Sequence, residues 1–224
     1  MNATRLKVIG IVSMTIDHIG YFLFPQMTIL RIIGRLAYPI FAYMIAEGCR
    51  YTRNKIRYFC TVLAIACACS AAAYFSERSL YQSIFTTFSC AMLLIFALTA
   101  VKETVERAEK IFWGICTMML VFLYFAVFQL WMIPGFETDY GFLGIITPVL
   151  VWLGFTKAEK LSRLTIGLCL LSAELGMVQF YSLAAVILLY FYDGERGKHS
   201  LKWAFYAYYP LHIAVLYGVS QIIR

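Results

Sequence analysis

Long apolar runs separated by short polar segments make up this chain. The first run, residues 6–24, matches the roughly 20 apolar residues that a membrane-spanning helix needs. The second run contains Pro39, which predicts a kink. The stretch 164–192 is too long for one helix and too short for two full-length ones, so it predicts two short helices that turn near residues 176–179. The predicted helices are therefore residues 6–24, 29–47, 58–75, 83–101, 111–133, 141–155, the pair within 164–192, and 203–223.

Positive charge is distributed unevenly among the loops. With a cytoplasmic N-terminus, alternate loops fall inside near residues 50, 105, 160 and 198, and outside near residues 26, 78, 137 and 178. Nearly all loop Lys and Arg residues then lie inside, whereas the outer loop with Glu137 and Asp139 has no basic residue, in agreement with the positive-inside rule. The pattern predicts an all-α, polytopic membrane bundle of about nine transmembrane helices, with eight as the alternative.

Composition supports this class. The chain is 62% hydrophobic and 14% charged, whereas soluble domains are about 45–50% apolar and about 25% charged. No polar stretch is long enough for a soluble domain, so residues 1–224 are expected to form a single transmembrane domain in contact with the lipid bilayer. The net charge of +7 lies mostly in short loops, so it indicates topology and not nucleic-acid binding. The seven cysteines show no metal-ligand spacing and are interpreted as packing residues.

Two ionisable residues, Asp17 and His18, lie in the middle of the first run. Charge at bilayer depth is unfavourable, so such residues usually face a bundle interior or a wet cavity. At about 1.5 Å per residue, His18 lies roughly 18 Å and His212 roughly 14 Å from the inner surface, so both can lie near the midplane. A histidine there can be a general base, a proton-relay member, a metal ligand or a hydrogen-bonded packing residue.

Asp17 and His18 cannot point the same way, because neighbouring helical positions are about 100° apart. Asp17 is therefore expected to orient or balance a group on another helix. Arg31 and Arg35 are four residues apart and share one face near the outer end of the second helix. Two interpretations stay open: an anion or carboxylate site in the outer half of the membrane, or snorkelling arginines with one ion pair to Asp17.

Other polar residues are candidates with weaker signals. Glu47 closes the second helix beside a dense basic loop with Arg50, Arg53 and Lys55. This loop either sets topology or holds the phosphates of a nucleotide-type cofactor. Glu174 is either an intramembrane functional carboxylate or an exposed helix end. The pair Asp139 and Tyr140 predicts a turn before a helix.

Several blocks of the sequence resemble the TraX family. They are TIDHIG (15–20), LRIIGRLAYPIFAYMIAEGCRYTRN (30–54), TDYGFLGI (138–145), YDGERG (192–197) and FYAYYPLHIAVLY (205–217). TraX proteins are multi-helix proteins of the bacterial inner membrane, and their namesake acetylates the N-terminus of pilin. The resemblance implies acetyl transfer from acetyl-CoA and kinship with membrane acyltransferases that use an embedded histidine. The matching position is His18, with Asp17 beside it.

The resemblance also covers His212 in the Y-P-L-H block, and Arg31, Arg35 and Glu47 in the second helix. The chain departs from the family pattern in two places. Residues 70–74 are SAAAY where an acidic S-E-I-P-F-like segment is expected, and residues 192–197 have Glu195 in place of a lysine. These departures leave the acceptor open: a protein N-terminus, another amine or a sugar.

Three functions follow as hypotheses. In the first, a membrane acyltransferase uses His18 as general base, with His212 orienting the acceptor or stabilising the oxyanion. The second is a proton-coupled transporter, and the third is a non-catalytic assembly factor of a conjugation or secretion machine. In the first hypothesis, the acetyl-CoA phosphates are held at the inner face by Arg50, Arg53, Lys55, Arg196 and Lys198. The acceptor arrives near Arg31, Arg35 and Asp139. In the second, the proton relay consists of Asp17, His18, Glu174 and His212.

Overall fold

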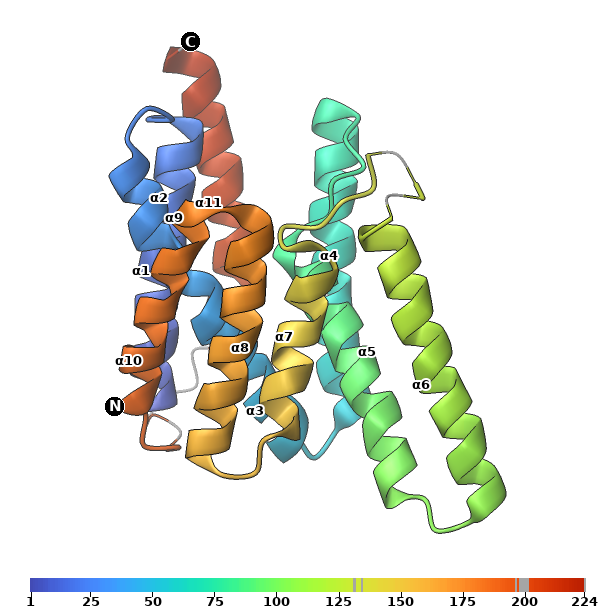
Figure 1. Ribbon diagram of the computed structural model, residues 1–224. Coiled ribbons are helices and arrows are strands. Elements are labelled where there is room, and N and C mark those ends of the chain that lie inside the picture. Colours follow the sequence, from blue (N-terminus) through green and yellow to red (C-terminus); the bar gives the residue numbers. More distant parts are fainter. Residues whose placement is uncertain (131, 134, 196, 198–201, 224) are drawn as a thin grey trace. The chain divides into compact units, whose positions relative to one another are not determined.

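The computed structural model describes residues 1–130, 132–133, 135–195, 197 and 202–223 (Figure 1). These residues form helices, and their only bridge pairing is an isolated one between Gln82 and Thr138. The all-α prediction is confirmed. The chain divides into two compact units: residues 1–44 with 157–224 form unit 1, and residues 45–156 form unit 2. The single transmembrane domain stays a prediction.

Apolar helices mark the chain as a membrane protein. Within the described residues, four helical stretches are long and apolar enough to cross a membrane: Thr28–Tyr51, Lys55–Phe75, Ile84–Glu103 and Arg107–Phe128. The last of these exposes large apolar side chains, with Met118 75% and Phe122 72% accessible. Such a surface suits contact with lipid. The count of nine spans and the cytoplasmic N-terminus stay predictions.

Unit 1 is built around α1, which packs against α2 on one side and α11 on another (Figure 1). Three side-chain contacts follow each other along α1 and α11: Thr15 with Tyr208, His18 with His212, and Phe22 with Tyr217. Both residue numbers rise together, so the two helices run parallel. The helices of this unit are α1 (Ala3–Phe22), α2 (Thr28–Gly34), the start of α3 (Ala37–Tyr51), α8 (Lys157–Leu175), α9 (Met177–Phe180), the 3-10 turn η1 (Tyr181–Leu183), α10 (Ala184–Tyr190) and α11 (Lys202–Ile223).

The apolar stretch 164–192 is split, as predicted. The chain turns at Gly176, whose φ of 90° is readily adopted only by glycine. Lys157, at the start of α8, donates to the carbonyls of Tyr190 and Tyr192 at the end of α10. The stretch therefore goes out along α8 and returns along α9, η1 and α10, so that both of its ends lie on one side of unit 1.

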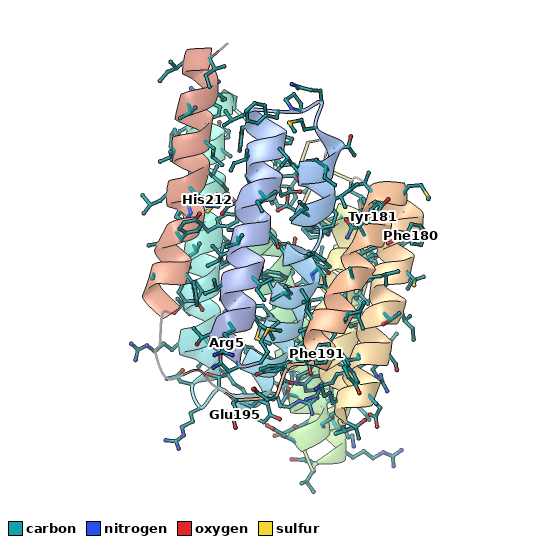
Figure 2. The ribbon with its side chains drawn as sticks, turned by 90° about the vertical axis from the view of Figure 1, so that its left-hand side faces the viewer. Arg5, Phe180, Tyr181, Phe191, Glu195 and His212 are labelled. Carbon is teal, nitrogen blue, oxygen red and sulfur yellow. The ribbon has the colours of Figure 1, made fainter. Side chains whose placement is uncertain are left out.

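The N-terminal end of α1 lies on that same side. The Ala3 N–H donates to the Glu195 carbonyl at 2.9 Å, and the Met1 ammonium lies 3.0 Å from the Asp193 carboxylate. The backbone N–H of Glu195 and that ammonium hold the pKa of Asp193 below its ordinary value. Figure 2 shows Arg5 and Glu195 at this end of the unit. The arrangement agrees with the loop alternation inferred from charge.

One predicted helix is interrupted, and one predicted loop is wrong. The kink expected in the second helix is a break between α2, which ends at Gly34, and α3, which begins at Ala37; the two together form the stretch Thr28–Tyr51. Pro39 has no N–H to donate to the Arg35 carbonyl, so the helix opens one turn before the proline. The predicted loop 156–163 is helical instead, because α8 begins at Lys157. Lysine, glutamate and arginine are good helix formers, so the first turns of α8 stay helical although they are charged.

Unit 2 is organised around α5, which packs against α4, α6 and α7. Its inward side chains, such as Met92 and Ile95, are fully buried. Lys55 pairs with Glu103 at one end of the unit, and the Tyr81 hydroxyl donates to Asp139 at the other, at 2.7 Å. The helices are α4 (Lys55–Glu77), α5 (Ile84–Glu103), α6 (Arg107–Phe128) and α7 (Gly141–Leu153).

Two glycine substitutions test the close packing of α1 on α2. A Cβ on Gly34 would overlap the Asp17 side chain, whereas a Cβ on Gly114 in α6 meets nothing within 4 Å. Gly34→Ala is expected to destabilise the protein by about 1–3 kcal/mol through overpacking. Gly114→Ala is expected to stabilise it by up to about 1 kcal/mol, because alanine favours the helix. Melting temperatures in a nonionic detergent measure both, and equal shifts of the same sign would contradict the α1–α2 contact.

Candidate functional site

Two histidines from opposite ends of the sequence form a pair inside unit 1. His18 Nδ1 lies 2.8 Å from His212 Nε2, although the residues are 194 positions apart. The ring centroids are 4.9 Å apart, and His212 is 8% exposed. Figure 2 labels His212 on α11 beside α1. The parallel packing of α1 and α11 is what brings the two rings to the same level.

Neighbouring side chains hold both rings in place. The Tyr208 ring stacks on His212 with centroids 5.0 Å apart and planes 8° from parallel. The Tyr208 hydroxyl in turn lies 2.8 Å from the Thr15 hydroxyl of α1. Tyr209 presents its ring edgewise to both histidines, at 6.2 Å from His18 and 5.5 Å from His212. The two helices are thus joined by a hydroxyl pair one turn away from the imidazole pair.

The hydrogen bonds determine which nitrogen carries each proton. His212 Nδ1 lies 2.9 Å from the Tyr208 carbonyl oxygen, which can only accept, so this nitrogen carries a hydrogen. The Nε2 of a neutral His212 is then an acceptor, and His18 Nδ1 must donate to it. His18 Nε2 is left with a lone pair and has no hydrogen-bond partner among the residues described. A proton that arrives at the pair can therefore be taken up on His18 Nε2 without breaking either hydrogen bond.

Asp17 faces the other neighbour of α1. One of its carboxylate oxygens accepts from Arg31 Nη1 at 2.7 Å, and the other accepts from Arg35 Nη2 at 3.1 Å. Arg31 also reaches the Asp17 carbonyl oxygen, and Arg35 Nε donates to the Arg31 carbonyl. The Asp17 carboxylate is thus held between two guanidinium groups. We expected Asp17 to pair with a group on another helix. The structure shows ion pairs with both Arg31 and Arg35, and not with one of them alone.

Gln179 extends this cluster. Its Oε1 accepts from Arg35 Nη1 at 3.3 Å, and the residue is 2% exposed. It comes from α9, which packs against α2. Asp17 and His18 thus serve different partners: Asp17 faces Arg31 and Arg35 from α2, and His18 faces His212 from α11. The helical geometry expected from the sequence is observed.

The sequence profile described as "TraX protein" matches residues 2–220. The chain belongs to the TraX family. It is 25% identical to the "Probable fimbrial assembly protein FimC, serogroup H1" of Dichelobacter nodosus, over 100% of this chain and 97% of that protein. It is 55% identical to the "Uncharacterized protein RP591" of Rickettsia prowazekii over 38 residues, which are 17% of this chain and 15% of that protein. No solved structure matches.

The basic residues expected to hold a nucleotide in this TraX chain differ in whether they have partners within the protein. Arg50 donates to the carbonyls of Trp152 and Gly154 and lies over the Phe155 ring. It thereby satisfies orphan carbonyls at the end of α7. Lys55 pairs with Glu103 at 3.5 Å, and Arg53 is exposed. Arg196 and Lys198 lie outside the described residues.

The remaining polar candidates lie in different surroundings. Asp139 belongs to unit 2, where its carboxylate accepts from Tyr81. Tyr140 packs its Cβ against Gly144 one turn into α7. Glu47 is half-buried on α3. Glu174 is exposed near the C-terminal end of α8.

Sequence reasoning assigned no role to four residues that contact the histidine pair or the Asp17 cluster: Thr15, Tyr208, Tyr209 and Gln179. A helical face count offers a signal for two of them. Thr15 precedes His18 by three positions and Tyr208 precedes His212 by four, so each shares a face with its histidine. Gln179 was assigned only to a turn, and no periodicity in the sequence points to its contact with Arg35.

Proposed function

We propose that this TraX protein is a membrane acyltransferase that moves an acetyl group from acetyl-CoA to an amine or hydroxyl acceptor. The observation that supports it is the hydrogen-bonded pair of His18 and His212, which leaves His18 Nε2 able to accept a proton. A general base needs this combination of a held ring and an open lone pair. Family membership is consistent with a membrane protein.

In the proposed reaction, His18 Nε2 takes the proton from the acceptor nitrogen or oxygen as that atom attacks the thioester carbonyl carbon. The carbon–sulfur bond then breaks, and the CoA sulfur leaves and receives the proton from His18. The products are the acetylated acceptor and free CoA thiol. His212 holds the His18 ring through its Nε2 acceptor. Direct transfer and a path through acetyl-His18 give these same products, and both remain open.

The donor is proposed to enter from the basic cytoplasmic side. Arg50 and Lys55 already have partners within the protein, so Arg53 is the better placed of the three to meet a phosphate. Arg196 and Lys198 are proposed to contribute from the loop after Tyr192. The proposal includes a location in the bacterial cytoplasmic membrane and nine spans.

The name of one relative supports a class of acceptor. The Dichelobacter protein is named for fimbrial assembly, so a pilin or fimbrial subunit is the proposed acceptor, with its N-terminal amine as the reacting group. The same relative also supports a rival function, in which the protein helps fimbriae or conjugative pili to assemble without any chemistry of its own.

Turnover of acetyl-CoA by the purified protein tests the proposal. We expect CoA thiol to be released when a peptide with a free N-terminal amine is supplied, and the peptide to gain one acetyl group by mass. The same peptide with a blocked N-terminus is the matched control. Absence of acetyl-CoA binding and of CoA release with amine, hydroxyl and sugar acceptors would leave the assembly role as the better explanation. Proton movement across liposomes without any CoA requirement would instead indicate a transporter.

A further inference from the structure

The cluster around Asp17 has one more positive charge than negative. Arg31 and Arg35 contribute two guanidinium groups, and Asp17 contributes one carboxylate. The side chains are only 30%, 15% and 17% exposed, respectively. A surplus charge that is partly removed from water is unfavourable unless an anion balances it.

The cluster also has more donors than acceptors. Arg31 uses Nη1 for Asp17, and its Nη2 and Nε have no partner among the residues described. The Gln179 amide offers Oε1 to Arg35, while its Nε2 is buried and has no hydrogen-bond partner within the described ranges. Ser182 lies on η1, which packs against α2, and its buried hydroxyl likewise has no partner in the part of the chain that the structure describes. Buried polar groups without partners are rare, so these groups point to a ligand rich in acceptors.

We propose that Arg31, Arg35 and Gln179, with Ser182, form a binding site for a phosphate-type oxyanion, either the phosphodiester of a phospholipid headgroup or free phosphate. Arginine binds such groups through two parallel N–H donors. One bound monoanion cancels the surplus charge and supplies the missing acceptors. These residues come from α2, α9 and η1, whereas His18 pairs with His212 of α11, so anion binding can be tested separately from acetyl transfer.

The surroundings favour entry from the lipid. Arg31 lies 5.4 Å from the ring centroid of Tyr21, which is 60% exposed. Apolar side chains beside the cluster are also exposed, among them Ile29 on α2 and Phe180 and Tyr181 (Figure 2). Such side chains can contact acyl chains while the arginine holds the headgroup, as in interfacial belts of membrane proteins.

Melting of the full chain in dodecyl maltoside tests the site with two probes. One arm compares dioctanoyl-phosphatidylglycerol with dioctanoylglycerol, which lacks the phosphate. The other compares inorganic phosphate with chloride at equal ionic strength. We expect a saturable rise in melting temperature with at least one phosphate probe and none with its control, because a ligand that binds only the folded state stabilises it. The arm that responds identifies the source of the anion.

Variants separate this site from general charge effects. Gln179→Glu places a carboxylate beside Arg35, so it should keep the fold and weaken binding of the phosphate probe by about tenfold or more. Arg31→Gln should weaken binding to a similar degree. Arg107→Gln removes the same charge at the exposed start of α6 and should leave binding unchanged. Stabilisation by neither probe, equal binding in Arg31→Gln and wild type, or an equal loss in Arg107→Gln would each overturn the inference.

Discussion

Replacement of His18 by alanine is expected to lower acetyl transfer by about 10²–10⁴-fold, the usual contribution of a general base. The expected loss follows from the open lone pair on His18 Nε2, because no other base is hydrogen-bonded to this pair in the described part of the chain. Initial rates of CoA release, measured at saturating acetyl-CoA, give the effect. The melting temperature of each variant shows whether the fold is kept.

The conservative variant His18→Asn separates chemistry from packing. The amide nitrogen of asparagine stands as many bonds from the backbone as His18 Nδ1, so His18→Asn can still donate to His212. It has no group at the position of Nε2. We therefore expect His18→Asn to melt close to the wild type and to be as inactive as His18→Ala. A fully active His18→Asn protein would show that the base is another residue.

His212 is expected to act as a positioning residue. Its Nε2 accepts from His18 at 2.8 Å. His212→Gln places an acceptor oxygen at the same bond distance from the backbone, whereas His212→Asn places nothing there. Glutamine should therefore retain most of the activity, and asparagine should lose about tenfold, the value of one hydrogen bond. If both variants behave alike, the bond between the two rings has no part in the rate.

Substitution of Asp17 by asparagine is expected to cause the largest loss of stability. It leaves Arg31 and Arg35 without their counter-charge in a mostly buried place. Breaking a buried pair by removing one partner destabilises by about 3–5 kcal/mol. We expect about 3 kcal/mol here, because Arg31 is 30% exposed and retains some contact with its surroundings. The melting temperature should fall by about 6–12 °C, given about 2–4 °C per kcal/mol for a chain of this size.

A double-mutant cycle with Arg35→Gln provides the control. In the wild type, this change removes a partner of Asp17; in Asp17→Asn, it removes an uncompensated charge. The second effect should be smaller than the first, or even stabilising, which gives a coupling free energy of at least about 1 kcal/mol. Strict additivity of the two substitutions would mean that Asp17 and Arg35 do not interact in the protein as studied in detergent.

The site could be anticipated from sequence where a physical rule leaves few options. A charged residue inside an apolar run must have a partner, and α2 offers two arginines at the right depth, so the Asp17 cluster was predictable. The depths of His18 and His212 predicted only that both can lie near the midplane, and the hydrogen bond between them is seen in the structure alone. The role of Arg50 was not predictable, because its acceptors are carbonyl oxygens of Trp152 and Gly154. Every residue has a backbone carbonyl, so the residue types do not indicate which carbonyls accept a side-chain hydrogen bond.

The fold shows the same division. Hydrophobic runs predict where helices lie, because a run in an apolar environment must form its backbone hydrogen bonds internally. Helix ends are set by hydrogen bonds of single residues. Pro39 opens the chain before α3, and the charged segment from Lys157 extends α8 beyond its apolar part. Charge alone could not distinguish a loop from the first turns of a helix.

The distance in sequence between paired residues bears on the order of events during synthesis. Asp17 meets Arg31 and Arg35 only 14 and 18 positions away, so this carboxylate can reach both partners once the first 35 residues have been made. The partner of His18, His212, is 194 positions away and is synthesised much later. A nascent chain can therefore form the Asp17 cluster long before it can form the imidazole pair, and a chain released before α11 would have the cluster but lack that pair.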